Sequence, residues 1–334
     1  MTSSRLADIE RRRDLARRDF QDPAKHYVRT TGWLPAAKRR ATVGRSQGRK
    51  WLTYFTLPAE NAIDVWLLYE AGLLEYDTAS FPGVRYCEKD TETFVAIKNV
   101  LGGTRGWNKT FEDVCTDPEF KETCPYDILN LDFTAALFSA RQPPYAATLD
   151  AIERLFQLQQ DRPFDMFLTL KSAPGMDDHG AVNQLQQLMV DNLSDHSDLR
   201  EAFRQRFGQM PSQLRRTDYA AFLLATVPKM IAGFAASADW DMERLESFRY
   251  SRGQYNILKL LFSFRRPPHD GGNVMIRARR YRRRQAAYVE AVRELMRVEP
   301  TNVDNRLTDN PALVKQLSDQ VVDLINRHAE FSIG

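Results

Sequence analysis

The feature that most constrains the fold is an alternation of strand-like and helix-like segments that begins at Trp51. Short runs rich in apolar, β-branched and aromatic residues lie at 51–57, 84–88, 126–133 and 164–170. Segments with apolar residues at helical spacing follow them at 59–74, 91–101, 145–160 and 176–193. Strands that alternate with helices imply right-handed βαβ crossovers. We therefore predict an α/β fold with an open, mainly parallel, doubly wound sheet.

Two later runs break this rhythm and predict how the sheet ends. The runs 247–251 and 256–264 are strand-like and flank the turn-forming residues Arg252-Gly253-Gln254. This pattern is typical of an antiparallel hairpin. We expect helices over 197–235 and 310–328, and only a fragment of strand or turn over 111–115.

The chain divides into three parts by composition. Residues 1–50 are expected to form a basic N-terminal helix at 4–20 and a linker or arm at 34–50. Residues 51–265 are expected to form the α/β domain. Residues 266–334 contain a basic loop followed by C-terminal helices, so the α/β domain has helical extensions at both ends.

Composition excludes several classes of protein. Hydrophobic residues make up 43% and charged residues 27% of the chain, which excludes global disorder. No uninterrupted apolar run approaches the roughly 18–20 residues that span a bilayer, and the N-terminus has no apolar signal core, so we expect a cytoplasmic protein without a membrane partner. The 3 cysteines lack CxxC spacing and the 5 histidines lack HExxH or HxH spacing, so we expect no metal.

Basic residues gather in two places, which predicts contact with a polyanion. Residues 1–50 hold 14 Lys and Arg against 5 Asp and Glu, and a second cluster spans 277–284. We expect DNA or RNA to contact these two places. An alternative is that the arginines only form solvated helix faces. The candidate nucleic-acid residues are Arg39, Arg40, Arg277, Arg279, Arg280, Arg283 and Arg284.

Polar side chains follow the second and fourth strand-like runs. Glu88 and Asp90 come after one strand, and Asn130 and Asp132 interrupt the end of the other. In an open parallel sheet the carboxyl ends of the strands form the ligand site, and a carboxylate at the second strand suits the vicinal hydroxyls of a ribose. An alternative is that Asp90 only caps the following helix.

With the hairpin, residues 51–264 resemble the class I S-adenosylmethionine-dependent methyltransferases. The run Asn130-Leu-Asp-Phe133 is similar to the Asn/Asp-Pro-Pro-Tyr/Phe motif of amino methyltransferases, which holds the target amine and its base. The sequence departs from the family at Leu57–Asn61, which has no glycine where the family has a glycine-rich turn, and at Leu131 and Asp132, which replace the motif's prolines. The resemblance implies S-adenosylmethionine as cofactor, with cofactor contacts at Pro58, Glu60, Glu88, Asp90 and Asp113 and substrate contacts at Asn130, Asp132 and Phe133.

Two functions fit these features. The first is a methyltransferase-like enzyme that acts on or near nucleic acid. The second is a non-catalytic module of a larger assembly, which has lost the glycine-rich turn and binds nucleic acid or protein.

Overall fold

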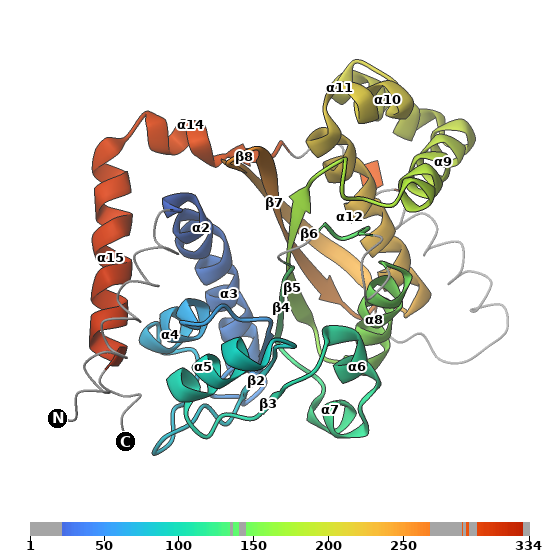
Figure 1. The fold of residues 1–334 in the computed structure, drawn as a ribbon. Helices are drawn as coiled ribbons and strands as arrows, with labels where there is room; N and C mark the ends of the chain where they lie inside the picture. The colour runs from blue at the N-terminus through green and yellow to red at the C-terminus, as the bar shows by residue number, and fades with distance from the viewer. Residues whose placement is uncertain are drawn as a thin grey trace, which may run out of the picture. The chain divides into compact units, whose positions relative to one another are not determined.

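The strand order defines the architecture of the computed structural model (Figure 1). The sheet has eight strands in the order β3-β2-β1-β4-β5-β7-β6-β8. β1 is parallel to β2 and β4, β2 is parallel to β3, and β7 is antiparallel to both β5 and β6. The predicted α/β class is confirmed, including the antiparallel hairpin. The strands are β1 Tyr54–Thr56, β2 Val84–Cys87, β3 Gly106–Trp107, β4 Ile128–Asp132, β5 Phe164–Ser172, β6 Asp241–Arg252, β7 Tyr255–Arg265 and β8 Thr301–Asn302.

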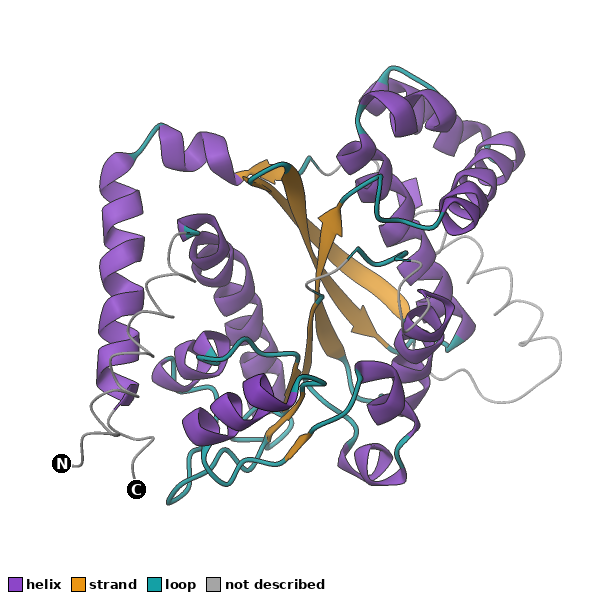
Figure 2. Ribbon diagram, in the orientation of Figure 1, coloured by secondary structure: helices purple, strands orange, loops and turns teal. Residues whose placement is uncertain are grey.

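The structure describes residues 22–133, 136–139, 145–267, 289, 292–293 and 299–329. The helix expected at 4–20 and the arginine cluster at 277–284 lie outside these residues. Helices flank the strands (Figure 2). They are α2 Pro23–Val28, the π-helical turn η1 Arg29–Trp33, α3 Leu34–Ser46, α4 Ile63–Glu70, α5 Thr91–Leu101, α6 Phe111–Thr116, α7 Pro118–Thr123, α8 Tyr145–Leu158, α9 His179–Asp195, α10 Ser197–Phe207, α11 Pro211–Thr217, α12 Tyr219–Ser237, α14 Val303–Thr308 and α15 Pro311–Ala329.

Contacts divide the chain into two compact units. Unit 1 comprises Met1–Asp117, Tyr126–Asp132 and Asn302–Gly334, and unit 2 comprises Pro118–Pro125 and Phe133–Thr301. Unit 1 contains strands β1 to β4, and its helix α15 packs on α2 and α4 although it comes more than 200 residues later in the chain. Unit 2 contains β5, β6 and β7 with helices α7 to α12.

Two segments differ from the sequence-based expectation. The segment 34–50, expected as a linker or arm, is mostly helix α3, whose buried positions include Ala37, Ala41 and Gly44. Small residues on one face allow this basic helix to pack closely. The segment 111–115 is helix α6, because Thr110 caps it by accepting a hydrogen bond from the Asp113 backbone N–H at 3.2 Å.

Each unit buries its own aromatic residues. In unit 1 the His328 ring of α15 stacks on Trp66 of α4 with ring centroids 4.0 Å apart, and its Nε2 lies 3.0 Å from the Glu70 carboxylate. In unit 2 Phe164 packs edge-on against Trp240 with centroids 5.0 Å apart.

The hairpin turn uses Gly253 at φ 60°, a conformation that glycine adopts with little strain.

Helix α12 is long and apolar enough, by length and composition, to cross a membrane. Its mean hydropathy is 1.5, and 67% of the segment is buried inside unit 2. Burial of this extent is what the central helix of a protein core shows, so the helix is weak evidence for a membrane span.

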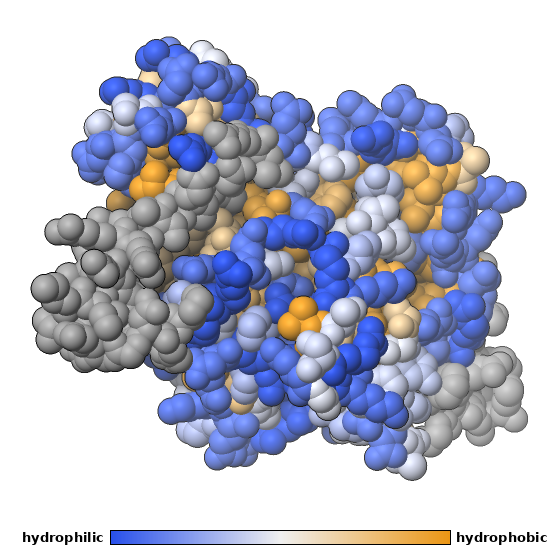
Figure 3. All heavy atoms as spheres, turned by 180° about the vertical axis from the view of Figure 1, so that it is seen from behind, coloured by the Kyte–Doolittle hydropathy of each residue, from blue (hydrophilic) through white to orange (hydrophobic). Residues whose placement is uncertain are grey.

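The face in Figure 3 is mostly hydrophilic, with apolar residues in smaller groups.

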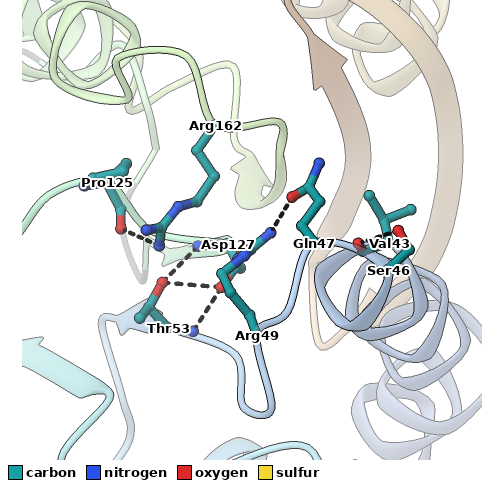
Figure 4. Close-up of polar contacts among 8 residues, drawn as sticks. All are labelled: Val43, Ser46, Gln47, Arg49, Thr53, Pro125, Asp127 and Arg162. Atoms are coloured by element: carbon teal, nitrogen blue, oxygen red, sulfur yellow. Dashed lines mark hydrogen bonds and ion pairs between the residues drawn. The ribbon is translucent and has the colours of Figure 1, made fainter.

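A buried ion pair fastens the amino ends of β1 and β4 in unit 1 (Figure 4). Asp127 precedes β4, is fully buried, and pairs with the Arg49 guanidinium. Its other oxygen accepts hydrogen bonds from the Thr53 backbone N–H at 2.9 Å and the Thr53 hydroxyl at 3.1 Å. Arg49, part of the expected basic arm, therefore neutralises a carboxylate of its own chain.

We predict that Arg49→Met destabilises the protein by about 3 kcal/mol, because it leaves the Asp127 carboxylate buried without its counter-charge. Urea unfolding measures this loss. Arg45→Met is the matched control, because Arg45 is an exposed residue in the last turn of α3 and its loss changes net charge equally. Equal stability of the two variants would contradict a structural role for Arg49.

Candidate active site at the carboxyl ends of β1, β2 and β4

The order of the strands places a topological switch point inside unit 1. From β1 the chain proceeds to β2 and β3 on one side, whereas β4 lies on the other side of β1. Since these strands are parallel, their carboxyl ends meet at one edge. Ligands of open α/β sheets bind at this edge, beside the switch point.

A hydrogen-bonded cluster lies beneath this edge. The register aligns Thr56 of β1 with Tyr86 of β2 and Asn130 of β4 in one row. The Asp64 carboxylate of α4 accepts three hydrogen bonds at one oxygen, Oδ2. They come from the Tyr54 hydroxyl at 2.5 Å, the Thr56 hydroxyl at 2.8 Å and Asn130 Nδ2 at 3.0 Å. Burial, followed by the negative charge of Asp64, raises the pKa of Tyr54 well above its usual value, so this phenol stays a donor.

The cluster fixes the orientation of the Asn130 side chain. Asn130 Nδ2 donates to both the Asp64 carboxylate and the Thr56 hydroxyl, the latter at 3.1 Å. The opposite orientation would place the amide oxygen against the carboxylate oxygen, and two acceptors repel. The amide oxygen Oδ1 therefore points away from Asp64; it is buried and has no hydrogen-bond partner among the described residues. An unsatisfied buried acceptor costs about 1–3 kcal/mol, which a ligand donor would offset.

The end of β2 carries the expected pair of carboxylates in two different roles. The Asp90 side chain caps α5 by accepting from the Thr93 backbone N–H at 2.8 Å, and this hydrogen bond lowers the pKa of the exposed Asp90. Glu88 is half-buried, and its Oε1 accepts from the Asp90 backbone N–H at 2.8 Å. Asn108 supports the turn by donating to the Glu88 carbonyl at 2.9 Å. Asp90 therefore acts as a helix cap, and Glu88 is the carboxylate positioned at the edge.

The loop after β1 makes a tight turn without glycine. Pro58 is buried, and Glu60 Oε2 and Asn61 Nδ2 are buried atoms without hydrogen-bond partners. Ala62 begins α4 in the left-handed region at φ 43° and ψ 40°. Left-handed backbone costs a non-glycine residue roughly 1–2 kcal/mol. The loop thus has at Ala62 the conformation that a glycine would supply, and it directs two unpaired polar groups inward.

The end of β4 is closed by helix α2. Lys25 Nζ lies 3.0 Å from the Asp132 carboxylate, and both side chains are mostly buried. Phe133, which follows Asp132, is half-buried. Asp132 is therefore held by an internal ion pair. Of the three residues expected to contact substrate, Asn130 presents a buried atom that has no partner in the described part of the chain.

The other expected residues lie away from this cluster. Asp113 is exposed in the first turn of α6, where its carboxylate accepts from the Thr110 hydroxyl at 2.8 Å. Arg39 is exposed on α3, whereas Arg40 is only 7% exposed. The expected arginines at 277–284 lie outside the described residues.

Sequence reasoning missed the residues that organise the site. Tyr54 and Thr56 look like ordinary strand residues, and Lys25 looks like part of a solvated basic segment. Asp64 offered one signal, because it is a lone carboxylate in the apolar run Ile63-Asp-Val-Trp-Leu-Leu68. A carboxylate in such a run has to be hydrogen-bonded or exposed.

Helix α2 also carries a buried histidine. His26 is 3% exposed, and its pKa is lowered to about 4, first by burial and then by the positive charge of Arg29. The ring is therefore neutral in the folded protein near pH 7.

We predict that stability is lost as the pH falls from 6.5 towards 4. In this window His26 takes up a proton in the unfolded chain but not in the folded protein. The free energy of unfolding therefore falls by about 3 kcal/mol. Urea unfolding at pH 7.5 and 4.5 measures the change. His26→Gln should show a smaller loss than the parent, and an identical pH dependence in both proteins would contradict the prediction.

Comparisons with known proteins place these features in context. A comparison with curated proteins found no match. A protein from Pyrococcus horikoshii, PH1948, provisionally assigned as an RNA methyltransferase, is 12% identical with a TM-score of 0.35, over 70% of this chain and 84% of that one. A Burkholderia thailandensis 1,6-didemethyltoxoflavin-N1-methyltransferase, with bound 1,6-didemethyltoxoflavin and S-adenosylhomocysteine, is 9% identical with a TM-score of 0.31, over 80% and 92%. Both TM-scores are below 0.5, so the fold assignment rests on the strand order.

A protein-family model described as PP_RS20740-like matches residues 108–333. This match begins just after β3 and includes β4, the hairpin and both C-terminal helices. Because the model covers more than half of the chain, the protein belongs to the PP_RS20740-like family.

Proposed function

We propose that the protein is an S-adenosylmethionine-dependent methyltransferase-like enzyme that acts on or near nucleic acid. The observation that carries the proposal is the Asn130 amide, which lies at the switch point with its nitrogen anchored and its oxygen free to accept. An amine donor of a methyl acceptor would fit this oxygen. Methyl transfer mainly requires that the two reactants are aligned and that water is excluded. One fixed hydrogen-bond acceptor for the amine is therefore enough to orient the methyl acceptor.

The residues at the edge fit S-adenosylmethionine in two respects. Glu88 at the end of β2 offers a carboxylate to the ribose hydroxyls. The unpaired polar atoms of Glu60 and Asn61 would serve the amino-acid end of the cofactor. When bound, the cofactor supplies the methyl group on a sulfonium; the chain supplies binding, orientation and a dry environment.

Two observations favour the alternative of a non-catalytic module. Asp132, a polar residue of the fourth-strand motif, is engaged in an ion pair with Lys25, and the loop 57–61 has no glycine. Both features would reduce access to the edge. Ligand binding and methyl transfer therefore have to be tested separately.

We predict that the purified protein binds S-adenosylhomocysteine and that Glu88→Gln weakens binding at least about tenfold, because it removes charge-assisted hydrogen bonds to the ribose. Calorimetry measures the affinity. Glu75→Gln is the control, because Glu75 is exposed in a loop of the same unit. Absence of heat and of thermal stabilisation with either S-adenosylmethionine or S-adenosylhomocysteine at millimolar concentration would overturn the proposal. Binding without methyl transfer to DNA or RNA would support the non-catalytic module.

We predict that nucleic acid binds through the arginines at 277–284. If about five phosphates are neutralised, log K falls with log salt at a slope of roughly −3.5 for single strands and −4.5 for double strands. Replacing Arg279, Arg280, Arg283 and Arg284 with Ala should flatten this slope for all sequences. The matched control replaces four exposed arginines of unit 2, namely Arg200, Arg216, Arg244 and Arg252, and removes the same charge. Equal slopes in the two variants would contradict this prediction. They would favour the alternative that these arginines only form solvated helix faces.

A further inference from the structure

Arg29 is an unusual residue of unit 1, because its charge is buried. It begins the π-helical turn η1, directly after α2, and is only 7% exposed. Its Nε is completely buried and has no hydrogen-bond partner among the described residues. Arginine cannot shed its proton in a protein, so this charge persists at every relevant pH.

Arg29 is largely buried and its Nε has no partner among the described residues, which makes a bound anion the natural partner of its guanidinium. The effective penalty for burying a charge is several kcal/mol per ion, and it is relieved when an anion pairs with the guanidinium. Asp132, the acid that Lys25 of the same helix contacts, is already engaged in that ion pair. The lowered pKa of His26 agrees with this picture, since the positive charge of Arg29 is its second cause.

The local backbone also suggests a functional site. A π-helical turn is rare and frequently lies at functional sites. Within η1 the hydroxyls of Thr30 and Thr31 donate back to the Tyr27 carbonyl at 3.1 and 2.7 Å, so neither is spent on the Arg29 side chain. Lys25 precedes Arg29 by four residues, and positions four apart lie on the same face of a helix.

We propose that Arg29, with Lys25 one turn before it, binds a phosphate group of a ligand. A guanidinium presents N–H donors in a fixed fork that matches phosphate oxygens. Lys25 lies at the carboxyl end of β4 through its contact with Asp132, so the phosphate lies about one helical turn from that end of the strand. This site stands on the burial of Arg29 and does not depend on cofactor binding. If methyl transfer takes place, the site selects an acceptor that carries a phosphate.

The test is urea unfolding of the full chain with and without inorganic phosphate, at constant ionic strength maintained with chloride. At ten times Kd, phosphate should lower the unfolding equilibrium constant of the parent about elevenfold by linkage. Arg29→Met should abolish this effect and should be no less stable than the parent without phosphate, because it replaces a largely buried cation, whose Nε has no partner among the described residues, with an apolar side chain. Arg29→Lys keeps the charge and should retain a weaker phosphate effect. Arg45→Met, on the exposed face of α3, should behave as the parent does.

Other outcomes overturn the proposal in distinguishable ways. If Arg29→Met is destabilised without phosphate and phosphate does not stabilise the parent, a carboxylate of the protein itself already pairs with Arg29. If phosphate stabilises Arg29→Met as much as the parent, the anion binds elsewhere. Acetate in place of phosphate distinguishes the two oxyanions, and equal stabilisation by acetate would overturn the preference for phosphate. An NMR titration adds a direct readout, because bound phosphate should raise the pKa of His26 from about 4 towards its ordinary value.

Discussion

The interaction on which the candidate site depends is the buried carboxylate of Asp64. A carboxylate taken out of water is tolerated only when hydrogen bonds replace its hydration. Here one oxygen accepts from Tyr54, Thr56 and Asn130, two residues of β1 and one of β4. The same contacts attach α4 to the two strands that border the switch point. The same hydrogen-bond network therefore stabilises the fold and positions the site. Loss of one partner would leave the others unsatisfied.

The buried polar side chains at the two ends of these strands differ in how far they are satisfied by partners. At the amino ends Asp127 is fully compensated by Arg49 and Thr53, which fixes the register of β1 beside β4. At the carboxyl ends the side chains of Glu60, Asn61 and Asn130 each retain a buried atom without a partner. Natural proteins satisfy nearly all buried polar atoms, so each of these three atoms is a candidate ligand contact. The amino ends hold the fold together, and the carboxyl ends are available for chemistry.

Basic residues of the N-terminal region serve the fold more than their composition indicated. Lys25, Arg29, Arg40 and Arg49 are all at least partly buried, and two of them pair with carboxylates at opposite ends of β4. The apolar stem of such a side chain can pack while its charged head reaches an acid. A count of charges along the sequence cannot distinguish this arrangement from a solvated basic arm.

The sequence by itself determined the fold class, since the alternation of apolar runs with helically spaced segments leaves few arrangements other than a parallel sheet with crossover helices. It also determined the terminal hairpin through Gly253, the position of Glu88 after β2 and that of Asn130 near the end of β4, because these depend on short-range pattern and turn chemistry. Tertiary structure alone decided that Asp132 pairs with Lys25 and that Asp64 orients Asn130. Those outcomes depend on contacts between residues 66 to 107 positions apart in the chain, and local propensity carries no information about which distant partner will neutralise a charge. The burial of Arg29 belongs to the same class, because burial is a property of the folded chain and not of a segment.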